Sequence, residues 1–271
     1  MYNVTMSVIG AITLAFALTH HAAAEGLPDV LGIQLGMPAR EAYAKLQGAL
    51  PKNKVEVRSI NLPTIEKPVI LSFSSGSHNV AMGTEGDEVI VDVTLPPNKQ
   101  EVWRVSRLHF FPDKGIPRAT LLASLREKYG KETRVRYASP ITPQDENHIS
   151  SLLWLMNEQG RPAQRPPLNG ITDPIDTCNG GRGEAAHYVE TPMPNYGNKD
   201  LAWCMSSYTA VLAEFQDSAL PELYTQLSVI AVSLPFAGRA GEATMKWKNE
   251  IAEGQHRQDI DKAKQQEKPK L

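Results

Sequence analysis

The histidine residues of this 271-residue chain show none of the spacings that bind metal ions. His20 and His21 lie in an apolar N-terminal stretch, and the others stand singly at His78, His109, His148, His187 and His256. Metal-binding motifs bring several His, Cys or carboxylate ligands together at short spacing. The sequence therefore predicts no metal site, and His109, inside a predicted strand, is interpreted as half-buried and structural.

Two short segments carry some of the residue types of catalytic or phosphate-binding loops. Ser75–His78 (SGSH) joins serine to histidine, but no helix follows, whereas a G-x-S-x-G nucleophile lies between a strand and a helix. Cys178–Gly183 (CNGGRG) is rich in glycine but lacks the Lys-Ser/Thr pair of a phosphate loop. No paired spacing for acid–base work is found among the carboxylates Asp87, Asp92, Asp145 and Glu146. We predict no catalytic and no cofactor-binding residues.

The four tryptophans, Trp103, Trp154, Trp203 and Trp247, all lie inside predicted elements, which favours packing roles. Two alternative functions remain possible for these and other residues. Trp154 or Trp203 would line a groove in a binder of small ligands or glycans. In an envelope hydrolase, His187 and a neighbouring aspartate would meet only in the folded chain.

The N-terminus has the pattern of a secretory signal peptide. Residues 1–24 contain no Asp, Glu, Lys or Arg, and Met6–Leu18 is an apolar run too short to span a bilayer comfortably. Ala22, Ala23 and Ala24 supply small residues for cleavage before Glu25. We therefore expect a periplasmic or secreted protein without a transmembrane segment in the mature chain. The alternatives are an N-terminal core helix and a membrane anchor.

The only two cysteines are Cys178 and Cys204. An even pair of cysteines in an exported chain predicts a disulfide bond. A metal site or a reactive thiol would be the alternative, but no Cys-x-x-Cys motif supports metal binding. Long connections rich in Pro, Gly and Asn surround the pair, so the bridge would tie them to the rest of the fold.

Apolar periodicity predicts an α+β fold with an antiparallel sheet and helices packed on one of its faces. Val89, Val91, Val93 and Leu95 alternate along a strand, and residues 88–111 form a predicted hairpin. Further strands are predicted at 54–58, 69–73, 135–137, 150–157, 203–216 and 224–234. The last pair is apolar on both faces, as in a sheet covered on both sides.

Two helices follow prolines with a similar register. Pro38 begins a helix with an apolar face, and Pro117 begins another that ends before Gly130. Alanine and leucine stand six and eight residues after each proline, which suggests a duplicated helix-plus-strands unit. We divide the mature chain into residues 25–137, a second β-rich part at 138–254 that becomes helical from Ala240, and a charged tail at 255–271. The tail is predicted to be disordered, or alternatively to be a partner-binding helix.

The turn Gly32–Met37 (GIQLGM), entering an amphipathic helix, resembles a module of small exported bacterial proteins. The β-lactamase inhibitor protein and the small outer-membrane assembly lipoproteins contain it. The resemblance covers residues 31–51 and, more faintly, 116–130, and implies a two-layer α+β unit that works by protein–protein contact. It would place an interaction surface at Gly36, Met37, Arg40 and Tyr43.

The composition is that of an ordinary globular protein, and the formal net charge of −2 argues against nucleic-acid binding. We therefore predict an exported, non-enzymatic protein that binds another envelope protein. The sequence predicts neither the identity of that partner nor an oligomeric state.

Overall fold

The computed structural model describes residues 26–62, 65, 67–76, 86–111, 115–138, 145–163, 209–217 and 222–265. The predicted signal peptide and disulfide lie outside these residues, and so do His78, His187 and Trp203.

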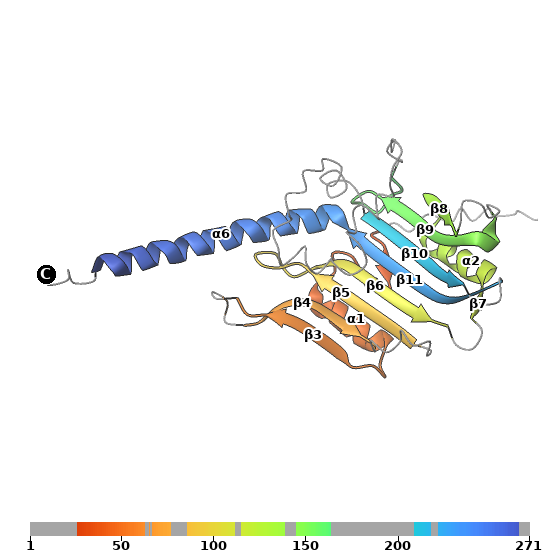
Figure 1. The fold of residues 1–271 in the computed structure, drawn as a ribbon, viewed down its shortest axis with the longest axis horizontal. Coiled ribbons are helices and arrows are strands. Elements are labelled where there is room, and N and C mark those ends of the chain that lie inside the picture. Colours follow the sequence, from red (N-terminus) through yellow and green to blue (C-terminus); the bar gives the residue numbers. More distant parts are fainter. Residues whose placement is uncertain are drawn as a thin grey trace, which may run out of the picture.

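One large antiparallel sheet organises the fold (Figure 1). Its strands follow one another in space as β3 (Val55–Ile60), β4 (Val69–Ser75), β5 (Gly86–Val93), β6 (Val102–Phe110), β11 (Leu223–Ser233), β10 (Thr209–Asp217), β9 (Ile149–Met156) and β8 (Arg134–Tyr137). The short β7 (Ile116–Pro117) pairs with β11. The predicted hairpin is β5–β6, and the predicted last pair is β10–β11. The α+β class is thus confirmed.

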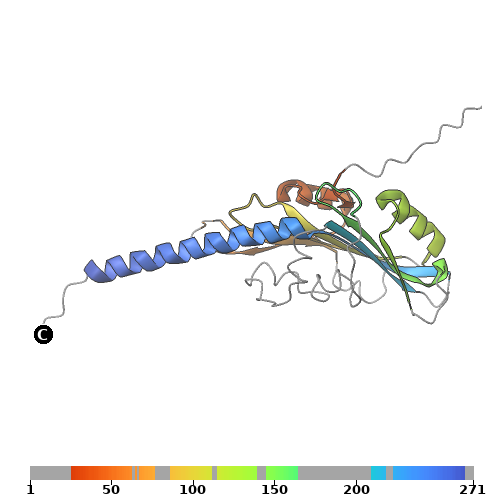
Figure 2. The same ribbon diagram turned by 90° about the horizontal axis from the view of Figure 1, so that it is seen from above.

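Helices α1 (Ala39–Ala49) and α2 (Arg118–Tyr129) pack on the same face of the sheet (Figure 2). Leu46 of α1 and Leu122 of α2 are fully buried and belong to one core cluster with Val91, Val105 and Val229 of the strands. The α1 stripe predicted from sequence is therefore turned toward the sheet. Burial of these aliphatic side chains is what holds two short helices in place.

A small hairpin fills the space between the two helices. Its strands, β1 (Asp29–Val30) and β2 (Ile33–Gln34), carry the buried Val30 and Ile33, and β1 contacts both β6 and β11. Asp29 joins the hairpin to α2, because its carboxylate pairs with Lys128 Nζ at 2.9 Å and its carbonyl accepts a hydrogen bond from Tyr129 Oη. The start of the described chain thus lies over the centre of the sheet.

The chain contains two similar units. The first unit is α1 with β3, β4, β5 and β6, and the second unit is α2 with β8, β9, β10 and β11. Their strand orders are mirrored, because β6 and β11 pair at the centre of the sheet while β3 and β8 form its edges. Buried residues occur one, four and eight positions after Pro38 and again after Pro117.

Details of the two units also correspond. The N–H of Ala39 donates to the carbonyl of Gln100 shortly before β6, and the N–H of Arg118 donates to that of Glu222 shortly before β11. Three positions after each of these acceptors, a one-residue bulge interrupts the strand, at Trp103 in β6 and at Thr225 in β11. Aligning the bulges makes each β6 residue equivalent to the β11 residue 122 positions later (225 − 103 = 122).

This alignment locates an approximate two-fold axis. Arg107 of β6 is equivalent to Val229 of β11, and these two residues stand directly opposite each other in the β6–β11 pair. The axis therefore passes between them. The two units are related by a half-turn about the middle of the sheet.

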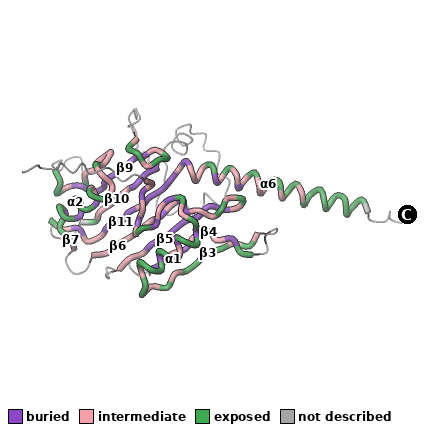
Figure 3. The backbone as a smooth tube through the Cα atoms, turned by 180° about the vertical axis from the view of Figure 1, so that it is seen from behind, coloured by how far each residue is buried: buried purple, intermediate pink, exposed green. Residues whose placement is uncertain are grey.

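The C-terminal helix α6 (Leu234–Gln265) begins directly after β11 and projects away from the sheet (Figures 1 and 3). Only its first turns are anchored, through the buried Ala240 and Thr244 and through Asn98 Nδ2, which donates to the carbonyl of Ala240. The helix starts before the predicted Ala240. It also continues through Gly254 to Gln265, which corrects the prediction of a disordered tail over that stretch. None of the helices in the described residues is both long and apolar enough to cross a membrane.

Candidate protein-binding face

The face of the sheet opposite α1 and α2 is the candidate site, and we call it the concave face. Figure 1 looks onto it with both helices behind the sheet, and Figure 2 shows the sheet bending away from them. Strand side chains alternate between the two faces. Val89, Val91 and Val93 of β5 join the helix-side core. Glu88, Ile90 and Asp92 therefore belong to the concave face.

Four side chains around the two-fold axis form the centre of this face. Ser106 and Leu108 of β6 are equivalent to Ser228 and Ile230 of β11. Across the central strand pair, Ser106 stands opposite Ile230 and Leu108 stands opposite Ser228. All four are partly exposed. We call them the central quartet, and both units contribute one small polar and one large apolar residue to it.

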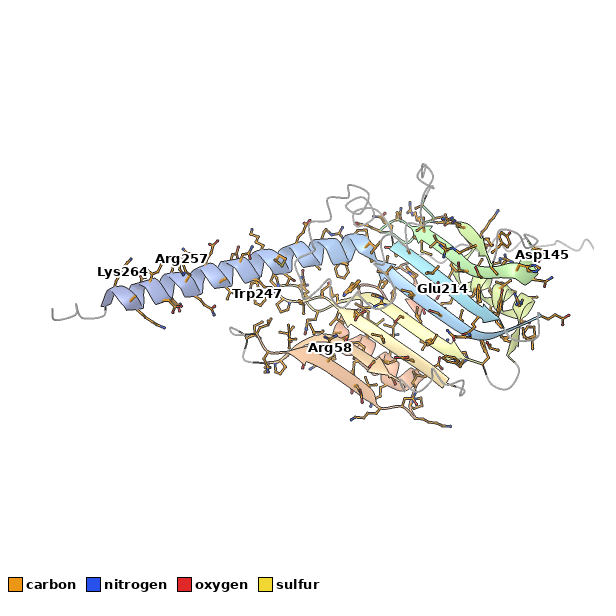
Figure 4. All side chains as sticks on the ribbon, viewed as in Figure 1. Arg58, Asp145, Glu214, Trp247, Arg257 and Lys264 are labelled. Carbon is orange, nitrogen blue, oxygen red and sulfur yellow. The ribbon has the colours of Figure 1, made fainter. Side chains whose placement is uncertain are left out.

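The two flanking strands add one glutamate and one apolar residue each. On β5, Glu88 stands opposite Leu108 and Ile90 stands opposite Ser106. On β10, Leu212 is paired with Ile230, and Glu214 with Ser228. A partly exposed apolar area thus lies at the middle of the face with a glutamate on each side. Figure 4 labels Glu214 in the second unit.

An ion pair lies toward the first-unit side of the face. Arg104 Nη1 of β6 is 3.1 Å from Asp92 Oδ2 of β5, and both side chains are largely buried. Burial raises the pKa of the Asp92 carboxyl more than the positive charges of Arg104 and Arg58 lower it. Arg58 (labelled in Figure 4) comes from the edge strand β3, so its charge extends this polar region to the border of the sheet.

The start of α6 covers the opposite corner of the concave face. Trp103, Leu153, Leu155, Ala210 and Val232 form a second core cluster there, and Leu234, Phe236 and Ala237 pack on it. This cluster explains why β10 and β11 are apolar on both faces. The indole N–H of Trp103 is buried without a hydrogen-bond partner among the described residues, an arrangement that costs stability and is rare in native proteins.

The other face holds a polar cluster at the junction of the two units. Asp87 Oδ1 accepts hydrogen bonds from Arg107 Nε at 2.6 Å and from His109 Nδ1 at 2.9 Å. Burial raises the pKa of Asp87, but the hydrogen bonds from His109 and Arg107 outweigh it and lower the pKa to about 2. The ionised carboxylate can only accept, so the proton on His109 sits on Nδ1.

Such an arrangement has the form of a carboxylate–histidine pair. A carboxylate on Nδ1 orients the ring, and Nε2 is then the atom that can exchange a proton with substrate or water. Among the described residues, no serine, threonine or cysteine is hydrogen-bonded to His109. A catalytic use of His109 would therefore act on water. No group of three His, Cys, Asp or Glu side chains in that same part of the chain is arranged to hold a metal ion.

The surface predicted at Gly36–Tyr43 is mostly engaged within the fold. The N–H of Gly36, at φ +81°, donates to the carbonyl of Val102, and the N–H of Val102 donates to the carbonyl of Met37. Tyr43 is partly buried, with its ring centroid 5.9 Å from that of Phe73. Arg40 is exposed. The turn thus joins α1 to β6, and of the predicted four residues Gly36 and Arg40 are exposed while Met37 and Tyr43 are partly buried.

The other residues considered in the sequence analysis as candidates for chemistry or binding do not lie together in the structure. Trp154 is 2% exposed, and its indole N–H donates to the carbonyl of Gly130. The alternative of a sugar-binding platform at Trp154 is therefore wrong. Asp87 and Asp92 lie on opposite faces of the sheet. Asp145 and Glu146 are at a short turn, where Asp145 accepts from His148 Nδ1 and Glu146 pairs with Arg126.

Sequence reasoning missed the concave face and the Asp87 cluster. The concave face depends on the pairing of β6 with β11, two strands more than a hundred residues apart. The Asp87 cluster lies within the predicted β5–β6 hairpin, but the register that places Asp87 opposite His109 was not predicted. A signal was present in the similar alternation of Val105–Leu108 (VSRL) and Leu227–Ile230 (LSVI), each with serine second. No family model, curated protein or solved structure matches the chain.

Proposed function

We propose that this protein is an exported binding module that receives a folded partner protein of the cell envelope on its concave face. The observation that carries the proposal is the partly exposed apolar area around the central quartet, which lies on a bent sheet with a glutamate on each side. Protein interfaces commonly combine an apolar centre with a polar rim. Glu88 and Glu214 on either side of the quartet favour a partner whose apolar contact is flanked by basic residues.

Three finer features belong to the same proposal. A signal peptide over residues 1–24 would bring the protein to the periplasm or outside the cell. A Cys178–Cys204 disulfide would form there. The shared bulges, helix starts and two-fold arrangement support duplication of one ancestral unit, in which each copy supplied half of the binding face.

Photo-crosslinking in intact cells tests the proposed face. A photoreactive amino acid would replace Ser106 or Ser228, which lie on the concave face. The matched controls carry it at Lys45 on α1 or Glu127 on α2, both exposed on the helix side. We expect one discrete protein adduct from Ser106 and Ser228 and none of that size from the controls.

Two results would contradict the proposal. Equal adducts from both faces would show that the contact is nonspecific, and the absence of adducts at Ser106 and Ser228 would show that the face is not occupied. With the partner identified, Ile230→Lys should weaken binding by about tenfold or more, because it places a charge at the apolar centre. Lys45→Ala should leave the affinity unchanged.

A hydrolase is the second candidate function, and the Asp87–His109 hydrogen bond is the observation that favours it. In this reading His109 Nε2 accepts a proton from the attacking water while Asp87 holds the ring. Turnover of ester, peptide or glycoside substrates by the purified protein, lost in His109→Ala and Asp87→Asn, would support it. Turnover that persists in both variants, or no turnover by the unaltered protein, would reject this site.

A further inference from the structure

The edge strand β3 has an exposed outer side. It pairs with β4 on one side and with no strand of the described residues on the other. Its residues from Glu56 to Ser59 are all exposed, and Val57 is 48% exposed. Only one other large hydrophobic side chain in the described residues, Ile260, is similarly exposed. An edge of this kind can form backbone hydrogen bonds with another strand.

The charges of β3 are complementary to those of a second, antiparallel copy of the same strand. Glu56 and Arg58 flank Val57 and share the concave face with the residues opposite them on β4. If two β3 strands pair with Val57 opposite Val57 of the second copy, each Glu56 stands opposite the other copy's Arg58. Opposite charges directly across an antiparallel pair are stabilising, whereas like charges are destabilising.

We propose that β3 is a homodimerisation edge, where a second copy of this chain pairs antiparallel in the register centred on Val57. The pairing matches both exposed valines and forms two Glu56–Arg58 contacts. Arg58 already interacts electrostatically with Asp92, but a guanidinium has enough N–H donors to bind two carboxylates. The proposal does not depend on the function proposed above.

Neighbouring registers of the β3–β3 pair give a less favourable pairing of charges. Centring the pair on Glu56 or on Arg58 brings two like charges into direct opposition. If the pair is centred on Val55, Arg58 has no acidic residue opposite it. Glu56 then stands opposite Lys54, which lies outside β3. The Val57 register pairs Val55–Ser59 within the two strands without opposing like charges, and Ile60 stands opposite Lys54.

The dimer would have a defined geometry. In the Val57 register, opposed residues of the two copies lie on the same face, so the two-fold axis is perpendicular to the sheet. The two sheets would join into one, with all four sheet-packed helices on one side. Both concave faces would then open on the other side.

Sedimentation equilibrium of the purified protein across the micromolar range tests the proposal by charge exchange. We expect a reversible dimer of the unaltered protein. Arg58→Glu should raise the dimer dissociation constant about tenfold or more, because both contacts become Glu–Glu. The double variant Glu56→Arg with Arg58→Glu restores two opposite-charge contacts and should recover the dimer. Arg136→Glu, on the other edge strand β8, is the matched control and should have no effect.

Cysteine cross-linking tests the register. Opposed side chains in an antiparallel pair are close enough for a disulfide, so Val57→Cys should form a covalent dimer under mild oxidation. Val55→Cys, on the same face and strand, should not. A monomer at every concentration, a double variant as weak as Arg58→Glu, or cross-linking from Val55→Cys instead would overturn the proposal.

Discussion

The two units share a scaffold but differ at the positions that face solvent or the junction. Asp92 and Arg104 form an ion pair in the first unit, where the second unit has the directly opposed amides Gln216 and Gln226. On the other face, Asp87 and His109 are equivalent to the buried Val211 and Ala231. A backbone that accepts aliphatic residues at a site does not require a charged cluster there. The charged residues of the first unit are therefore the ones to examine for function.

The connection between the second and third strands differs greatly in length between the two units. In the first unit it joins β4 to β5 through the ten residues 76–85, whereas in the second it joins β9 to β10 through residues 157–208 and holds both cysteines. We expect Cys178→Ser to reduce stability by about 3–4 kcal/mol, because the bridge would restrict the unfolded chain. Thermal melting should show the loss only under oxidising conditions. Equal melting of both proteins in oxidising buffer would remove the predicted disulfide.

The equivalence of α1 and α2 can be tested at their shared eighth position after proline. Leu46→Ala and Leu125→Ala each leave a cavity under a helix, and we expect losses of about 3 kcal/mol from both. Urea unfolding measures the change. Gln47→Ala, exposed on α1, is the control and should cost little. A large loss from one leucine alone would mean that the two helices are not equivalent supports.

The Asp87 cluster should make the stability of the folded protein depend on pH in the acid range. Its carboxyl has a pKa of about 2 in the folded protein against 3.8 ordinarily, so it stabilises the folded state above pH 4 by about 2 kcal/mol. This contribution is lost as the pH falls through the folded pKa. Asp87→Asn should therefore be less stable than the unaltered protein at pH 6.

The difference between these two proteins should shrink toward zero near pH 2. Urea unfolding across this pH range measures it. A difference that stays constant would show that Asp87 acts through packing rather than through its charge.

The two buried tryptophans of the sheet provide the smallest effect. Trp154 donates a hydrogen bond to the carbonyl of Gly130, whereas the N–H of Trp103 has no partner in the part of the chain that the structure describes. Replacement by phenylalanine removes similar volume from both sites, so the difference between the variants reports the hydrogen bond. We expect Trp154→Phe to cost about 1 kcal/mol more than Trp103→Phe in urea unfolding. Equal losses would indicate that a water molecule accepts from Trp103.

The local elements could be predicted because their patterns are short-range. Alternation over Val89–Val93 identified β5, and the proline-to-glycine pattern of 117–130 identified α2. The end of α6 could not be predicted from apolar periodicity, since its residues beyond Ile251 are mostly polar. Alanine, lysine, glutamate and glutamine are nevertheless good helix formers and extend a helix that is already nucleated.

The candidate site could not be predicted for a different reason. The concave face exists only because β6 and β11 pair. The similar alternation of residues 105–108 and 227–230 indicates two similar strands, but it does not show that they pair with each other. The turn at Gly36 and Met37 was predicted as an interaction surface from its local sequence. Its backbone hydrogen bonds to Val102 give it a structural role that no spacing reveals.

The hairpin between α1 and α2 also sets the order in which this protein can fold. Its strand β1 is the first described strand and contacts β11, the last, so the central seam closes only when almost the entire chain is present. Contacts so distant in sequence carry a large loop-closure entropy and slow the folding of a domain. The β3–β4 and β5–β6 hairpins pair strands that are close in sequence and can form locally. We expect the joining of the two units to be the slow step of folding, because it brings β1 against β11.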